Sequence, residues 1–179
     1  MERDEKDRYQ RLLLLLGLST LLTTADLRAA TGPARLELAP SDVATPLERG
    51  VSNAVRTAAA KLSDPSCQQV FSDFRDSAGR TMQENLDAAS QNPRGYLDLI
   101  LFYNGEGYSR CDARNTFAST SPGSRVVYIC APHFLEKLRR DPGQAAAIII
   151  HEELHSLGLG ENPPDSKEIT ARVIARCGR

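Results

Sequence analysis

The spacing of apolar residues predicts an amphipathic helix early in the chain. Between Thr45 and Ser63, apolar side chains recur at steps of three and four residues, which places them on one face of a helix. Thr45 is a suitable N-cap and Pro46 suits the first turn, so we expect the helix to begin there. The predicted buried face consists of Leu47, Val51, Val55, Ala58 and Leu62.

Short runs of strand formers alternate with helical patterns through the rest of the chain. Residues 97–103 and 125–130 are rich in strand formers, and residues 115–119 are a third, weaker candidate. Pro, Gly or Asn residues bound the expected helices, which cover residues 81–90, 132–140, 144–157 and 165–176. This combination predicts an α+β fold with a short β-sheet.

Residues 1–25 have the pattern of an export signal. Charged residues 1–11 precede an uncharged apolar run at 12–22, and the small residues Thr23 and Ala25 follow. A membrane-spanning helix needs about 20 apolar residues, whereas a signal-peptide core needs about 7–15. We therefore expect cleavage after Ala25 and a secreted or periplasmic protein. Residues 1–11 carry as many acidic as basic side chains, so an uncleaved apolar anchor is the alternative.

The region after the expected cleavage site divides into two parts. Residues 26–44 are irregular and contain Gly32, Pro33 and Pro40, so we expect a poorly ordered leader there. Residues 45–179 would then form the folded domain. For the mature chain we expect a monomer without a membrane span.

Charge and cysteine content narrow the possible functions. The 22 Lys and Arg residues balance 23 Asp and Glu residues, so no basic excess draws the chain to nucleic acid. All four Cys follow the apolar run, and an even number in an exported chain predicts two disulfides. Three pairings are possible. We favour Cys111 with Cys130, because both lie in strand-like segments, which leaves Cys67 to pair with Cys177.

Residues 151–155 carry the clearest chemical motif, His-Glu-Glu-Leu-His or HExxH. The residues before them are apolar all round, which predicts a buried helix. Residues four apart lie on one helix face, so His151 and His155 can direct both imidazoles at one Zn²⁺. Glu152 would be the general base. Burying such polar side chains is costly without partners, and a metal ion would supply them.

The segment 151–160 resembles the active-site helix of the zincins, the HExxH zinc metallopeptidases. Strand 125–130 is similar to the edge strand along which these enzymes bind substrate. The resemblance implies a small zincin-like domain with a short β-sheet, an active-site helix and a C-terminal helix. It also implies hydrolysis of a peptide or protein substrate by zinc-activated water, with Glu152 taking the proton.

A catalytic zinc site needs a third protein ligand, and two residues compete for this role. Glu161 lies where the metzincin pattern HExxHxxGxxH has its last His, and Gly158 would allow the required turn. The metzincin Met-turn is missing, because both Met residues lie upstream. Glu168 is the alternative, since gluzincins take a Glu from a second helix, although Arg172 replaces the acidic residue that usually follows. We favour Glu161.

Several weaker candidates and other functions stay open. His133 could donate to an oxyanion, although a structural role is more common for such a residue. Glu153 is expected to face solvent or to support the site. The chain could instead be a non-catalytic zinc-binding interaction module of zincin ancestry, which its small size favours slightly, or a disulfide-stabilised domain without metal. Mn²⁺, Fe²⁺ or Co²⁺ could replace Zn²⁺.

Overall fold

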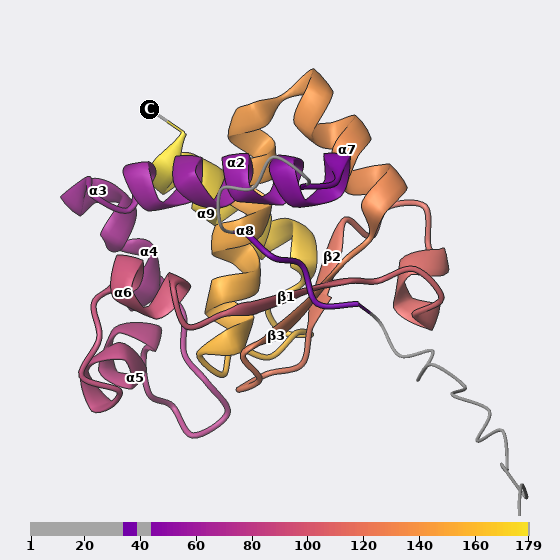
Figure 1. The fold of residues 1–179 in the computed structure, drawn as a ribbon. Coiled ribbons are helices and arrows are strands. Elements are labelled where there is room, and N and C mark those ends of the chain that lie inside the picture. Colours follow the sequence, from indigo (N-terminus) through magenta and orange to yellow (C-terminus); the bar gives the residue numbers. More distant parts are fainter. Residues whose placement is uncertain (1–33, 39–43, 179) are drawn as a thin grey trace, which may run out of the picture. The chain divides into compact units, whose positions relative to one another are not determined.

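The computed structural model describes residues 34–38 and 44–178 (Figure 1). The expected signal at 1–25 and most of the expected leader lie outside the described residues. The part that is described combines helices with a small sheet, which confirms the α+β class. None of its helices is long and apolar enough to cross a membrane.

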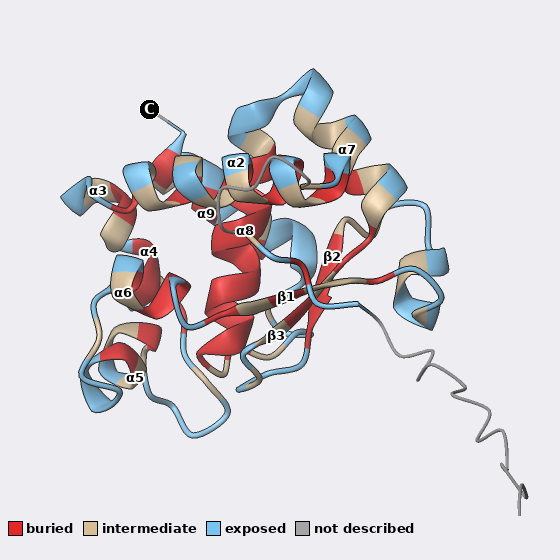
Figure 2. Cartoon of the chain, viewed as in Figure 1, coloured by how far each residue is buried: buried red, intermediate tan, exposed pale blue. Residues whose placement is uncertain are grey.

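Helix α8 (Pro142–Ser156) is buried on every side and carries the HExxH motif (Figure 2). Asp141 caps its N-terminus by accepting a hydrogen bond from the backbone of Gln144 at 2.9 Å. Every residue from 145 to 156 is buried, as the uninterrupted apolar run predicts. Helices α2 (Pro46–Lys61), α7 (Ala131–Arg140) and α9 (Ser166–Cys177) pack against α8, and so does the sheet.

Helix α2 begins where the sequence pattern predicts. Thr45 and Glu48 form a capping box, in which each side chain binds the backbone N–H of the other residue. Val51, Ala54 and Ala58 are fully buried on the face that meets α8. The apolar stripe therefore predicts which side of α2 faces the core.

The three-stranded sheet has the order β1 (Leu101–Asn104), β3 (Val126–Ile129), β2 (Ala118–Thr120). Strand β1 is parallel to β3, and β2 is antiparallel to it. The expectation that residues 125–130 form an edge strand is wrong, because β3 has a paired strand on both sides. Among the described strands, β2 is the edge strand that contacts α8.

The first of the expected strands, at residues 97–103, begins later in the structure than the sequence predicts. Residues 97–103 were expected to be extended, but Leu97 ends helix α6 (Pro93–Leu97) and only the later residues form β1. Asn92 accepts a hydrogen bond from the Gly95 backbone, so the Asn-Pro pair starts helix α6. The remaining short elements are α3 (Pro65–Gln68), α4 (Val70–Asp73), α5 (Met82–Ala88) and the 3-10 turn η1 (Ser109–Asp112).

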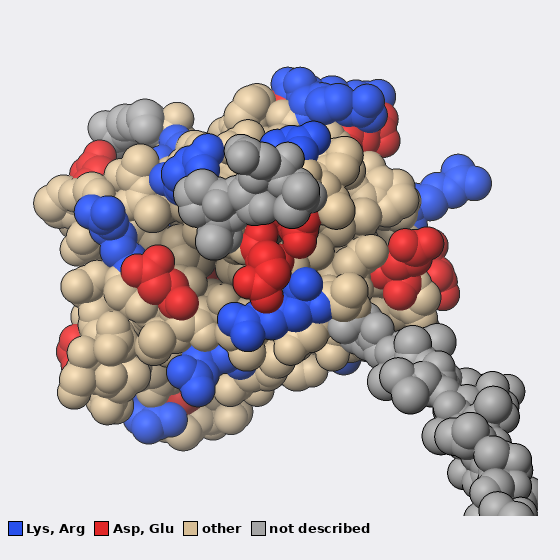
Figure 3. Space-filling model, viewed as in Figure 1, with Lys and Arg blue, Asp and Glu red and all other residues tan. Residues whose placement is uncertain are grey.

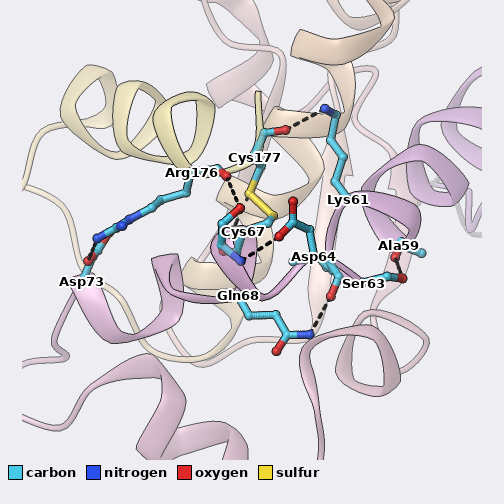
Figure 4. Close-up of a disulfide and its surroundings, with 11 residues drawn as sticks. Ala59, Lys61, Ser63, Asp64, Cys67, Gln68, Asp73, Arg176 and Cys177 are labelled. Carbon is cyan, nitrogen blue, oxygen red and sulfur yellow. Dashed lines mark hydrogen bonds and ion pairs between the residues drawn. A yellow bond between two sulfur atoms is a disulfide. The ribbon is translucent and has the colours of Figure 1, made fainter. Parts of the chain in front are cut away.

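Two disulfides form with the expected pairing, Cys111–Cys130 and Cys67–Cys177. Both Cys of the first pair were expected to lie in strands, but Cys111 lies in η1, and Cys130 directly follows β3 and precedes α7. The second disulfide joins the end of α9 to α3 (Figure 4). Close by, Arg176 makes two hydrogen bonds of 2.8 Å to Asp73. The C-terminal helix is thus attached covalently and ionically to the N-terminal half.

The two disulfides should contribute unequally to stability. Their Cys residues are 110 and 19 positions apart, so the Cys67–Cys177 bond restricts the unfolded chain more. Chain entropy predicts losses of about 5 kcal/mol for the longer loop and about 3 kcal/mol for the shorter one. Urea unfolding of the two double Cys→Ser variants measures this difference, and a larger loss for Cys111/Cys130 would contradict the prediction.

Candidate metal centre

The C-terminal end of α8 brings two imidazoles and one carboxylate together. The Nε2 atoms of His151 and His155 are 2.9 Å apart. An oxygen of Glu161, in the loop that follows α8, lies 3.3 Å from His155 Nε2 and 3.8 Å from His151 Nε2. These side chains form a group that could hold a metal ion. Both His are only 5% exposed, so water satisfies little of their polarity.

The spacing of the three ligand atoms fits a tetrahedral ion. With metal–ligand bonds of about 2.0–2.1 Å, the ligands of a tetrahedral zinc site lie about 3.3 Å from one another. The observed separations of 2.9, 3.3 and 3.8 Å lie on either side of this value. Two nitrogens and one oxygen also form a donor set that suits Zn²⁺. The residues therefore fit a metal without rearrangement of the backbone.

Each imidazole is oriented by a hydrogen bond at its other nitrogen. His155 Nδ1 lies 2.7 Å from the Leu159 carbonyl oxygen, which only accepts. The proton of the neutral ring is therefore on Nδ1, and the lone pair on Nε2 faces the cluster. His151 Nδ1 lies 3.0 Å from Thr170 Oγ1 on α9. Such partners fix the orientation of metal-binding imidazoles.

The electrostatics of the cluster favour a neutral His155 and an ionised Glu161. Burial lowers the pKa of His155, and the neighbouring His151 lowers it further. The imidazoles, His151 foremost, hold the pKa of Glu161 at about 2. Neutral His and ionised Glu are the protonation states in which these groups bind metals.

A tight turn after α8 allows Glu161 to approach the two His residues. Gly158 has a φ of 114°, which side chains other than hydrogen rarely permit. Its N–H donates to the His155 carbonyl at 2.9 Å, and the Leu159 N–H donates to the Leu154 carbonyl at 3.1 Å. These two bonds form a Schellman motif, with Leu159 and Leu154 both buried.

A carboxylate outside the cluster supports this turn. Asp76 accepts hydrogen bonds from the backbone of Ala78 and Arg80 and from the Asn85 amide. The same amide nitrogen of Asn85 also donates to the Leu157 carbonyl at 2.9 Å, at the end of α8. The Asn85 hydrogen bond is the main cause that lowers the pKa of Asp76, to about 2. This contact joins the loop before α5 to the turn that carries Glu161.

Glu152 is buried beside the cluster and is not one of the grouped ligands. It is 5% exposed, and its Oε2 has no hydrogen-bond partner among the described residues. Burial raises its pKa to about 7, although His151, Thr120 and Arg110 all act to lower it. A carboxyl group with one unpartnered oxygen is suited to accept a proton from a molecule bound next to it.

The structure places the other candidates away from the three ligands. Glu168 is exposed in the first turn of α9 and is not part of the group. His133 Nδ1 lies 3.0 Å from the Thr116 carbonyl. Glu153 was expected to face solvent or to support the site, but it is fully buried, and neither carboxyl oxygen has a partner in the described part of the chain. Burial raises its pKa well above the ordinary value, with Asp98 adding to the shift.

A cavity of about 770 Å³ opens onto the cluster. His151, Glu152, His155 and Glu161 line one side, and residues 118–120 of strand β2 line another. Segments on either side of β2 in the sequence and the start of α9 complete the wall. The sequence pattern predicts the ligands but not this enclosure, because it depends on how β2, η1 and α9 pack around α8.

Comparisons with models of known protein families, with curated proteins and with solved structures find no match to this chain.

Glu161 should be required for metal binding and Glu168 should not. Glu161→Gln keeps the size of the side chain but removes the ionised oxygen that faces both imidazoles, so affinity for Zn²⁺ should fall by at least about tenfold, as for loss of other metal-site contacts. Glu168→Gln is the matched control and should bind like the parent. Isothermal titration of the apo-proteins with Zn²⁺ measures the affinity of each variant. If Glu168→Gln lost affinity and Glu161→Gln did not, the third ligand would be assigned to α9.

The stability that Asp76 contributes should depend on pH. Its folded pKa of about 2 is lower than the value of about 3.9 for an unfolded Asp. The stabilisation is therefore complete above about pH 4 and is lost as the pH falls through about 2. Asp76→Asn should be less stable than the parent in urea at pH 7, and this difference should shrink towards pH 2. A stability difference between parent and Asp76→Asn that stays constant with pH would contradict this prediction. The control is Asp87→Asn, at an exposed position on α5.

Proposed function

We propose that this chain is an exported, zinc-dependent peptidase of the zincin type. The observation that carries the proposal is the group of His151, His155 and Glu161 at ligand separations, with Glu152 buried beside it in the same cavity. Two His and one Glu leave the fourth position of a tetrahedral ion open, as in catalytic zinc sites. When bound, the ion would supply a Lewis acid that polarises a carbonyl group and lowers the pKa of water.

Glu152 is assigned the role of general base. It lines the cavity, and its Oε2 has no partner within the described structure, so this oxygen can accept a proton from water in the cavity. The protonated carboxyl group can then pass that proton to the amine that leaves when the peptide bond breaks. Thr120 on β2 lies close enough to the Glu152 carboxyl group to lower its pKa, while its hydroxyl donates to the Val126 carbonyl at 2.9 Å.

A peptide substrate is supported by the position of β2. This strand pairs with β3 along one side, and no other described strand pairs with its second side. Its residues line the cavity next to the ligands. Unpaired strand edges can bind extended peptides through backbone hydrogen bonds, which would hold the chain along β2 without selecting its side chains. Residues 118–120 are themselves buried, so a peptide would reach β2 through the cavity.

Export is supported by the two disulfides together with the sequence of the first 25 residues. All four Cys are paired, and such bonds persist mainly in oxidising compartments. The charged segment, apolar run and small residues that precede the leader have the order of a cleavable signal. We therefore place the mature protein outside the cytoplasm.

The Glu152→Gln variant separates metal binding from catalysis. The substitution keeps the size of the side chain and leaves all three ligands intact, so Zn²⁺ should stay bound. Hydrolysis of a mixed peptide library should fall by about 10²–10⁴-fold, the usual contribution of a general acid–base group. Elemental analysis and mass spectrometry of the library measure the two properties, and Glu168→Gln is the control expected to retain both.

Three other results would each contradict part of this proposal. Hydrolysis by Glu152→Gln at the parent rate would exclude the proposed base. Loss of zinc from the same variant would make Glu152 a ligand. A parent that holds zinc and cleaves nothing would favour a zinc-binding interaction module over a peptidase.

A further inference from the structure

Two basic side chains line the cavity without a carboxylate partner. Arg110 belongs to η1, and Lys167 lies in the first turn of α9. Arg110 makes one weak contact with Ser119 Oγ at 3.4 Å. Neither residue has an ion pair with any described Asp or Glu, and Lys167 has no hydrogen bond there either. We propose that Arg110 and Lys167 bind a carboxylate of the peptide substrate and so select acidic peptides, an inference that rests on the proposed function.

Arg110 lies close to the expected site of reaction. Its contact with Ser119 brings it to the middle of β2, the strand along which we place the peptide. Its positive charge also acts on Glu152, whose pKa it lowers. A guanidinium at this position can reach a substrate group near the bond to be cleaved. Its planar array of donors matches the two oxygens of a carboxylate.

The Cys111–Cys130 disulfide holds Arg110 in place. Segment η1 has no buried residue of its own, so its packing anchors it poorly. The disulfide attaches Cys111 to Cys130, which is 1% exposed and follows β3 directly. Gly105 packs against the same bond, and a Cβ there would approach Cys111 Sγ to 2.7 Å. Arg110 is therefore next to a covalent anchor rather than on a free loop.

The acidic side chains that line the cavity belong to the candidate metal centre and do not form ion pairs with these two cations. Glu161 faces the two imidazoles, and Glu152 is buried beside them as the proposed base. These are the only acidic residues in the described cavity wall, and neither forms an ion pair with Arg110 or Lys167, so both cations can bind a group that enters from outside. Basic and acidic side chains are interspersed over the face in Figure 3, and the whole chain has a net charge of −1. A general attraction of the protein for polyanions therefore does not explain why Arg110 and Lys167 both line this cavity.

A peptide can offer a carboxylate from its C-terminus or from an Asp or Glu side chain. A hexapeptide library in four forms distinguishes these sources: free or amidated C-terminus, each with Glu or with Gln at the acidic positions. Zinc-loaded full-length protein should cleave the forms that carry the recognised carboxylate at least about tenfold faster than the neutral form. Tenfold corresponds to about 1.4 kcal/mol, which is within reach of one hydrogen bond to a charged group. The form that carries the preference identifies the source.

Variants of the cavity cations test which residues bind the carboxylate. Arg110→Gln should remove most of the preference and Lys167→Gln should reduce it, where the preference is the ratio of the cleavage rates of carboxylate-bearing and neutral libraries within each variant. Arg114→Gln is the matched control, since this Arg is exposed shortly after η1 but does not line the cavity. Equal cleavage of all four libraries by the parent, or a preference that survives in both cation variants, would overturn the inference.

A binding measurement keeps this test separate from the proposed function. Fluorescence anisotropy with labelled forms of the same libraries reports binding to the zinc-loaded Glu152→Gln variant, whether or not the parent cleaves anything. Tighter binding of the carboxylate forms, lost on adding Arg110→Gln, supports the inference even if peptidase activity fails. Equal binding of all forms overturns it even if the parent is an active peptidase.

Discussion

The burial of helix α8 on every side is the constraint on which the rest of the site depends. Residues 145–156 have no solvent-facing side, so the polar end of the helix lies inside the protein with its apolar end. Buried polar atoms need partners, and burial of an unpaired charge is costly. Thr170 and the Leu159 carbonyl satisfy the outer nitrogens of His151 and His155. The inner nitrogens face each other and Glu161, where a cation would satisfy all three.

The surrounding elements keep this arrangement in place from several directions. Helix α9 supplies Thr170, and the disulfide at Cys177 together with Arg176 fastens that helix to α3 and α4. The Gly158 turn directs the chain back towards the helix, and Asn85 connects it to Asp76. On the other side, β2 and η1 form the opposite wall. Distant parts of the sequence are therefore bonded together around a few polar side chains, and such supporting contacts are what precise placement of ligands requires.

Local patterns predict much of this fold and less of the site. The apolar periodicity of α2, the HExxH spacing and the glycine after α8 each report a local property, and the structure agrees with all three. The prediction that residues 125–130 form an edge strand was wrong. Whether a strand is central depends on its pairing, here with β1 and β2, and these contacts are distant in sequence. Glu153 was expected to face solvent or to support the site, and its complete burial depends on the elements that pack around α8. Arg110 lay outside every motif, and only the packing of η1 beside β2 brings it to the cavity.

The central claim is that His151, His155 and Glu161 hold one metal ion while Glu152 stays free of it. Anomalous diffraction at the zinc absorption edge, from crystals of the full chain grown with Zn²⁺, tests this most directly. We predict one strong peak at about 2.0–2.2 Å from both Nε2 atoms and from a Glu161 oxygen, without a bond to Glu152. No peak between these side chains, or an ion bound through Glu152 or Glu168, would contradict the claim.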